Sequence, residues 1–178
     1  EEGGEEERKE RGGKDRREGQ RRVILALDEV SDPMNLGAIL RSAHFLGAGG
    51  VMLSEKNCAP LSAIVSKASA GAMEVMDIVK CRNLPQELQA AKQAGWEVWG
   101  ADAGKHAVPV SSPSILPIPD RLVLVLGSEG SGMRKLVSRE CDKHVMIPAG
   151  REARKARLVD SLNVSVSAGI LLSHLLLH

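Results

Sequence analysis

The stretch LVLVLGSEGSGM, residues 122–133, decides the fold, because five apolar residues run directly into a loop that contains three glycines. A short uninterrupted apolar run is typical of a strand buried on both faces, as in a parallel sheet covered by helices. The glycines allow tight turns and let backbone atoms approach a neighbour closely. The stretch therefore predicts a central strand and a loop that lies against a ligand or another segment.

Apolar runs alternate with helical patterns on both sides of this stretch. The expected strands are residues 23–28, 50–55, 75–81, 96–103, 122–127 and 144–148. Helices are expected over residues 32–47, 60–73 and 84–95, in a short segment after Gly132, and from Ser161 onward; Asn35 is the expected N-cap of the first helix and Gly47 its stop. A proline-rich loop, residues 109–119, precedes the central strand. This alternation predicts an α/β fold, a mostly parallel sheet with helices on both faces.

The composition is that of one aliphatic domain preceded by a charged segment. The chain has 178 residues, a net charge of +1, and only Phe45, Trp96 and Trp99 as aromatic residues, which argues against base-stacking platforms. Residues 1–22 carry acidic and basic residues in equal number, so we expect a disordered linker there and one domain over residues 23–178. No apolar segment has the length of a membrane span. The chain opens on a charged run without Met and is interpreted as a fragment or a processed chain.

The cysteine pattern argues against a disulfide framework and against a metal site. Cys58, Cys81 and Cys141 are odd in number, far apart and without CxxC spacing. Such a pattern indicates a reducing compartment and no zinc.

Three polar segments should meet at the carboxyl ends of the strands, where open α/β sheets bind ligands. They are residues 35–41, GSEGSG at 127–132, and IPAG at 147–150 together with SLNVSVS at 161–167. The glycine loop has no following Gly-Lys-Ser/Thr and no dinucleotide fingerprint. Glu129 would repel phosphate, so the pattern indicates an uncharged or cationic ligand.

Single residues in these segments have two interpretations. Arg41 lies in an otherwise apolar helix, where it is either a snorkelling arginine or a functional cation. Ser161 can cap the last helix, with Asn163 in its first turn, where its carboxamide either caps the helix or serves a ligand.

Taken together, NLGAILRSA, LVLGSEGSGM and IP…SLNVSVSAGI resemble the three motifs of the SpoU branch of the SPOUT RNA 2′-O-ribose methyltransferases. The resemblance covers residues 23–178 and is closest to the mitochondrial members that act on large-subunit rRNA. It implies a C-terminal trefoil knot, a homodimer, and S-adenosyl-L-methionine as the cofactor. It also implies a mitochondrial matrix location and a guanosine ribose as the target.

The resemblance also assigns roles to residues. Arg41 would be catalytic, supported by Asn35, Glu129, Ser161 and Asn163. The cofactor would contact Ala101, Leu126, Gly127, Gly130, Ile147 and Leu162. Whether Arg41 acts as a base, through the substrate phosphate, or by orienting the hydroxyl stays open, because arginine is normally locked in its charged form.

Two departures from the family pattern concern RNA. Only the charged linker stands where family members usually carry a small RNA-binding domain. The loop PAGREARKARLVD, residues 148–160, is longer than in bacterial relatives and is basic at Arg151, Arg154, Lys155 and Arg157. These residues form either a solvated loop or, with Arg41, an RNA-phosphate contact. The alternatives are a catalytically silent RNA-binding module, a tRNA ribose methyltransferase, and a nucleotide-linked oxidoreductase.

Overall fold

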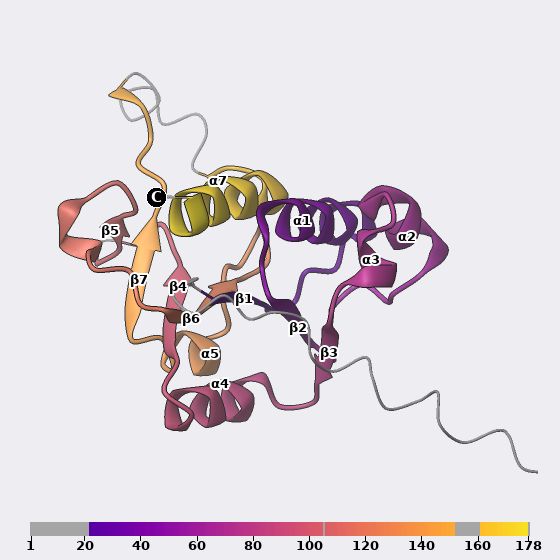
Figure 1. Cartoon of the computed structure of the whole chain (residues 1–178), viewed down its shortest axis with the longest axis horizontal. Coiled ribbons are helices and arrows are strands. Elements are labelled where there is room, and N and C mark those ends of the chain that lie inside the picture. The colour runs from indigo at the N-terminus through magenta and orange to yellow at the C-terminus, as the bar shows by residue number, and fades with distance from the viewer. Residues whose placement is uncertain (1–21, 105, 152–160, 178) are drawn as a thin grey trace, which may run out of the picture.

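The chain folds around a seven-stranded parallel sheet in the order β3-β2-β1-β6-β4-β7-β5 (Figure 1). The computed structural model describes residues 22–104, 106–151 and 161–177. The strands are β1 Arg22–Leu27, β2 Gly50–Ser54, β3 Ile78–Cys81, β4 Glu97–Ala101, β5 Val108–Pro109, β6 Arg121–Leu126 and β7 Lys143–Met146. Every pairing between them is parallel, so the predicted α/β sheet is confirmed.

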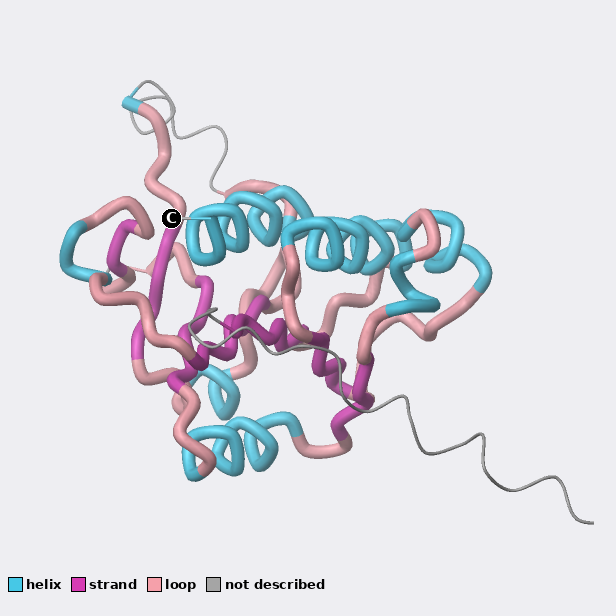
Figure 2. Tube along the Cα trace, in the orientation of Figure 1, coloured by secondary structure: helices cyan, strands magenta, loops and turns pink. Residues whose placement is uncertain are grey.

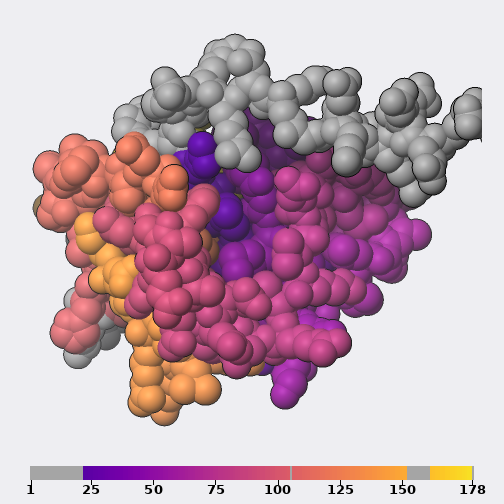
Figure 3. Space-filling model, turned by 60° about the horizontal axis from the view of Figure 1, so that its bottom comes forward, coloured from indigo at the N-terminus to yellow at the C-terminus, as the bar shows by residue number. Residues whose placement is uncertain are grey.

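Helices cover both faces of the sheet (Figures 1 and 2). One face carries α1 Pro33–Leu46, α2 Ala63–Ser69, α3 Ala72–Val75 and α7 Val164–Leu177. The other carries α4 Leu84–Gln93 and α5 Lys135–Ser138, and a 3₁₀ turn, η1, spans Pro113–Ile115. Figure 3 shows the face on which α4 and the α5 region lie side by side. The sheet thus separates two apolar clusters, the larger beneath α1 and α7 and the smaller beneath α4.

The predicted central strand is β6, which lies between β1 and β4. Its residues Leu122–Leu126 are all buried, as a strand covered on both faces requires. Its last residue, Leu126, pairs with Leu27 at the end of β1, so the loops that follow the two strands start at the same edge.

Several elements have bounds that differ from the sequence prediction. The helix expected over 60–73 is divided into α2 and α3 because Ala70 and Gly71 both have positive φ, 51° and 89°, which a continuous helix does not allow. Consequently Val75 belongs to α3, and β3 starts only at Ile78. The proline-rich loop holds η1, and its first residue, Pro109, pairs with β7 as part of β5.

The N-cap of α1 was also predicted wrongly. Asp32, not Asn35, is the cap, and its carboxylate accepts the backbone N–H of Met34 at 2.8 Å. Pro33 then takes the first helical position, where its missing N–H has no consequence. Gly47 ends the helix as predicted, with φ of 87°. Because the cap lies three residues before Asn35, Asn35 is inside the helix and its side chain can form other hydrogen bonds.

The three cysteines are free thiols. Burial raises the pKa of Cys81 to about 11 and that of Cys141 to about 12, so both stay protonated at neutral pH. Within the described part of the chain, none of the helices combines the length and apolarity needed to cross a membrane.

Gly37 sets how closely α1 approaches α2. A Cβ atom at this position would lie 2.4 Å from the Cβ of Ala68 and 3.0 Å from backbone atoms of Ala68 and Ser69. Those atoms belong to a helix and cannot yield easily, so the glycine between Asn35 and Arg41 is required by packing.

We predict that Gly37→Ala lowers the free energy of unfolding by about 1–3 kcal/mol through overpacking. This loss should occur although alanine is intrinsically favoured in a helix by about 1 kcal/mol. Gly169→Ala in α7 is the matched control, because its Cβ would meet only the Ser42 hydroxyl at 3.9 Å. Urea denaturation of both variants provides the measurement. A gain in stability for both would contradict the packing role of Gly37.

Candidate functional site

Three segments far apart in the sequence meet in one hydrogen-bonded cluster at the carboxyl edge of the sheet. Asn35 from α1 donates from Nδ2 to Oε1 of Glu129 at 3.1 Å. Asn163, just before α7, donates to the same oxygen and also to Oδ1 of Asn35 at 3.0 Å. The structure therefore brings together Asn35, Glu129 and Asn163, which the sequence analysis selected from three separate motifs.

The carboxylate of Glu129 lies at the N-terminus of α7. Its Oε1 accepts the backbone N–H of Val164 at 3.1 Å, one of the N–H groups that a helix leaves without an internal partner. Asn163 is the cap of this helix, because its Oδ1 accepts the backbone N–H of Ser165 at 2.9 Å. The prediction that Ser161 caps α7 is therefore wrong: Ser161 is exposed and, among the described residues, has no hydrogen bond to the cluster.

The glycine loop after β6 folds back on itself. Ser128 and Gly132 form two backbone hydrogen bonds of 2.9 and 3.1 Å, with Glu129 and Gly130 at the exposed tip. A Cβ atom on Gly127 would lie 2.2 Å from the backbone of Gly132 and Met133. The close approach predicted for this glycine is therefore to the loop's own backbone. Gly130, in contrast, has open space around it.

Arg41 lies apart from this cluster. It is six residues beyond Asn35 along α1, a rise of about 9 Å, and its side chain is exposed. Among the described residues the guanidinium has no ion pair or hydrogen bond. It is therefore available to an anionic partner from outside this chain, and the ordinary interpretation as a snorkelling arginine also stays open.

The residues predicted to hold a cofactor lie on three neighbouring strands and at α7. Ala101 ends β4, Leu126 ends β6, and Ile147 follows β7, and these three strands are adjacent in the sheet. Ala101 and Ile147 are half-buried and Leu126 is buried, whereas Leu162, before α7, is 45% exposed. Together with the loop they offer backbone groups, apolar side chains and one carboxylate. That set suits an uncharged or cationic ligand.

The predicted basic loop is described only at its start. Arg151 is exposed. Arg154, Lys155 and Arg157 lie outside the described residues.

Sequence analysis missed a partly buried ion pair at the base of the glycine loop. Asp28, the residue after β1, is fully buried, and Arg134, the residue after the loop, approaches it to 2.6 Å. Hydrogen bonding to Asp28 raises the pKa of the Arg134 guanidinium. A charged residue directly after five apolar strand residues, Val23–Leu27, was the available signal, since that is the same edge at which the other site residues were sought.

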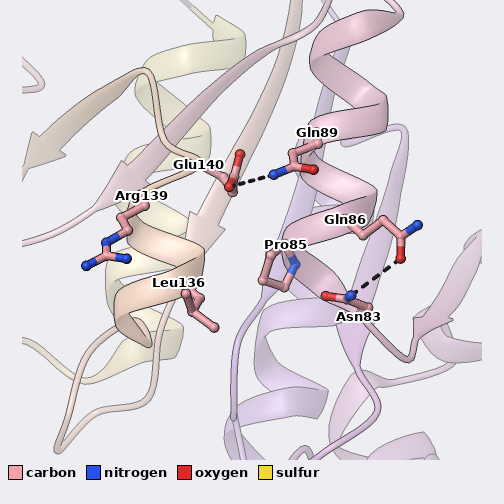
Figure 4. Close-up of a pocket in the computed structure, with 7 residues that line it drawn as sticks. All are labelled: Asn83, Pro85, Gln86, Gln89, Leu136, Arg139 and Glu140. Carbon is pink, nitrogen blue, oxygen red and sulfur yellow. Dashed lines mark hydrogen bonds between the residues drawn. The ribbon is translucent and has the colours of Figure 1, made fainter.

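A concave region lies on the other face of the sheet, between α4 and α5 (Figure 4). Its walls include Asn83, Pro85 and Gln89 on one side and Leu136 and Arg139 on the other. It holds none of the predicted site residues. In the parts of the chain that the structure describes, no group of three or more His, Cys, Asp or Glu side chains could hold a metal ion.

Comparison with known proteins extends these observations. Residues 22–173 match the model of the SpoU rRNA Methylase family. The chain is 43% identical over 155 residues to human mitochondrial rRNA methyltransferase 1, covering 83% of this chain and 43% of that protein. It is 42% identical over 159 residues to the Schizosaccharomyces pombe protein of the same name, covering 84% of this chain and 50% of the relative. The chain thus spans about half the length of these relatives.

A solved structure has the same fold. An AdoMet-bound rRNA methyltransferase from Sinorhizobium meliloti superposes with a TM-score of 0.73 at 29% identity, covering 86% of this chain and 55% of that one. The alternation of strands and helices that the sequence predicts is therefore shared with a methyltransferase domain.

We predict that Glu129→Ala loosens the start of α7. Hydrogen bonds to a charged group contribute about 1.5–3 kcal/mol, so amide exchange at Val164 should become at least about tenfold faster. Hydrogen–deuterium exchange measured by NMR reports this amide directly. Glu74→Ala, which removes a carboxylate bonded to Ser66 on the α2–α3 surface, is the control. Unchanged exchange at Val164 in the Glu129 variant would show that the cluster does not hold the helix.

Proposed function

Because the chain belongs to the SpoU rRNA methylase family, we propose that it methylates the 2′-hydroxyl of a ribose in large-subunit rRNA, with S-adenosylmethionine as methyl donor. The observation that carries this proposal is the cluster of Asn35, Glu129 and Asn163, since each of the three comes from a different motif. The base is proposed to be guanosine, as the resemblance of the three motifs implies. The proposed location is the mitochondrial matrix, since the names of the human and fission-yeast relatives include the word mitochondrial.

The residues present fit S-adenosylmethionine. When bound, this cofactor supplies an electrophilic methyl group on a positively charged sulfur. The glycine loop, Ala101 and Ile147 expose backbone groups and small or apolar surfaces, and Glu129 adds a negative charge that favours a cation. Leu126, Gly127, Gly130 and Leu162 complete the proposed set. A phosphate-bearing cofactor would instead meet the Glu129 carboxylate, which repels it.

Arg41 is proposed to act on the RNA. A ribose hydroxyl is a poor nucleophile and must lose its proton as its oxygen attacks. A permanently charged guanidinium can hold the neighbouring phosphate and stabilise the negative charge that develops on that oxygen. Asn35, Glu129 and Asn163 would fix the loop and the start of α7 around the reacting groups, and Ser161 would contact the substrate or cofactor from the adjoining loop.

RNA affinity is proposed to come partly from the basic residues Arg151, Arg154, Lys155 and Arg157. They follow Ile147, a member of the proposed cofactor set, by only four to ten residues in the sequence. Phosphate contacts of this kind bind RNA regardless of its sequence. About half of each relative lies outside the region that matches this chain. The choice of target nucleotide would then depend on a segment of that kind.

We propose that the C-terminal part forms a trefoil knot. Two features support this: β7 lies between β4 and β5 in the sheet, and α7 returns to pack against α1.

The protein is also proposed to act as a homodimer. Phe45 on α1 is 87% exposed, and Val166 and Ile170 on α7 are 49% and 40% exposed, so the two neighbouring helices present apolar side chains to solvent. Exposed apolar groups on adjacent helices are typical of an interface. A dimer formed through this surface would also allow Arg41 of one copy to approach the Glu129 cluster of the other copy. Within its own chain, Arg41 lies apart from that cluster.

A silent RNA-binding module is the main alternative, and methyl transfer by the wild-type protein distinguishes the two; the Arg41 variant tests the role of Arg41. We predict that Arg41→Ala reduces methyl transfer by at least about a hundredfold, the range expected for a group acting at the reacting atoms. Its affinity for S-adenosylmethionine should stay within about threefold, because Arg41 lies outside the proposed cofactor set. Transfer of labelled methyl to large-subunit rRNA from cells lacking the protein, and calorimetry with the cofactor, measure the two effects.

The matched control is Arg82→Ala, which removes another exposed arginine, 3.8 Å from Glu55. It should leave methyl transfer unchanged. Wild-type protein that binds S-adenosylmethionine but methylates neither rRNA nor tRNA would favour the silent module, and methylation of tRNA alone would favour the tRNA enzyme.

For the dimer, we predict that Phe45→Glu combined with Val166→Glu gives a monomer, because two charges would have to be buried without partners. Multi-angle light scattering at micromolar concentration should give about twice the chain mass for the wild type and the chain mass for the variant. Leu136→Glu on α5, 63% exposed on the opposite face, is the control and should stay dimeric. A monomeric wild type would reject the dimer.

A further inference from the structure

Asp28 is fully buried, and in the described part of the chain the hydrogen-bond and ion-pair partners of its carboxylate belong to Arg134. Its Oδ1 accepts Nε of Arg134 at 2.8 Å and lies 2.6 Å from Nη2, while its Oδ2 accepts the backbone N–H of Arg134 at 2.8 Å. A buried charge is tolerated only when it is paired and hydrogen-bonded in this way. The pair therefore has a fixed geometry as well as a favourable interaction.

The same residue bonds to both ends of the glycine loop. The backbone N–H of Asp28 donates to the carbonyl of Leu126, the last residue before the loop, at 2.8 Å. Its carboxylate binds Arg134, the residue directly after Met133 at the loop's other end. Asp28 thus closes residues 127–133 at their base, and Glu129 projects from the tip.

Arg134 also contacts residues at the ends of β1 and β2. Its Nη2 donates to Oγ of Ser54, the last residue of β2, at 3.4 Å, and its Nε lies 3.7 Å from Glu29. The guanidinium therefore joins the ends of β1 and β2 to the segment that follows β6. An apolar contact could fill the same space, but it would not fix a direction for the loop.

We propose that the Asp28–Arg134 pair is a positioning device that sets Glu129 for S-adenosylmethionine binding; this rests on the proposed function. Glu129 must meet donors from α1 and α7 at the same time, so a small rotation of the loop would break its bonds to Asn163 and Val164. Directional closure at the base prevents that rotation. Arg134 acts through Glu129 and is a positioning residue.

The main test replaces the pair by apolar residues of similar size, Asp28→Leu with Arg134→Met. Such a replacement often keeps stability, so a loss of binding reports on geometry. We expect S-adenosylmethionine affinity to fall by at least about tenfold in calorimetry. Amide exchange at Val164, measured without cofactor, should quicken by a similar factor. Wild-type affinity and wild-type exchange in this variant would overturn the proposal.

Arg134→Lys covers the case in which the double variant does not fold. Lysine keeps the charge and the backbone N–H but loses the fork, so binding should weaken by about threefold or more while the variant stays folded. Lys92→Met, which breaks ion pairs with Glu140 and Asp142 away from the loop, is the control and should bind normally. Normal binding by Arg134→Lys together with unchanged exchange at Val164 would overturn the proposal.

A double-mutant cycle tests whether Arg134 acts through Glu129. In a Glu129→Gln background, Arg134→Lys should change cofactor affinity by less than about twofold, since the group being positioned is already altered. If the two substitutions have fully additive effects on cofactor affinity, Arg134 does not act through Glu129. If the wild type itself does not bind S-adenosylmethionine, the proposed function fails, and exchange at Val164 still decides whether the pair positions Glu129.

Discussion

A single buried carboxylate determines how the carboxyl edge of this sheet is arranged. Asp28 lies where β1 ends, and its backbone and side chain together bond to both ends of the loop that follows β6. The chain then runs only four residues to the Asp32 cap, so the start of α1 is also fixed relative to that loop. Asn35 and Glu129 can therefore meet although the sequence separates them widely. The cost of burying Asp28 is offset only because Arg134 supplies both a charge and directed N–H groups.

Two charges of the proposed site, those of Glu129 and Arg41, are opposite in sign and lie apart. The Glu129 carboxylate accepts hydrogen bonds from donors at α1 and at the start of α7. The N-terminus of α7 directs the backbone N–H of Val164 at that carboxylate. Arg41, six residues beyond Asn35 on α1, is exposed and positively charged. A cationic methyl donor and an anionic polymer would each find a complementary region, which is the arrangement that a reaction between the two requires.

The sequence predicted the layers of the fold well because burial on both faces leaves an unbroken apolar run such as LVLVL. It predicted local details less well wherever they depend on distant partners. Asparagine favours the cap position, so the local sequence predicts a cap at Asn35. Asp32 followed by Pro33 is the cap in the structure, and Asn35 bonds to Glu129 instead. The two residues of β5 form a strand only through their pairing with β7, which no local pattern reveals. The partnership of Asp28 and Arg134 spans most of the domain and was missed for the same reason.

The position of β6 beside β1 also has a consequence for how the chain acquires its structure. Arg22 pairs with Arg121 and Leu27 with Leu126, so the middle of the sheet closes only after most of the domain has been synthesised. Until then one side of β1 has no neighbour, and the growing chain carries an apolar edge that can join other chains. Contacts this distant in sequence slow folding, because a long loop must close before any of them forms. The cluster that holds Asn163 is completed later still, so a partly made chain can have a sheet but cannot yet have a site.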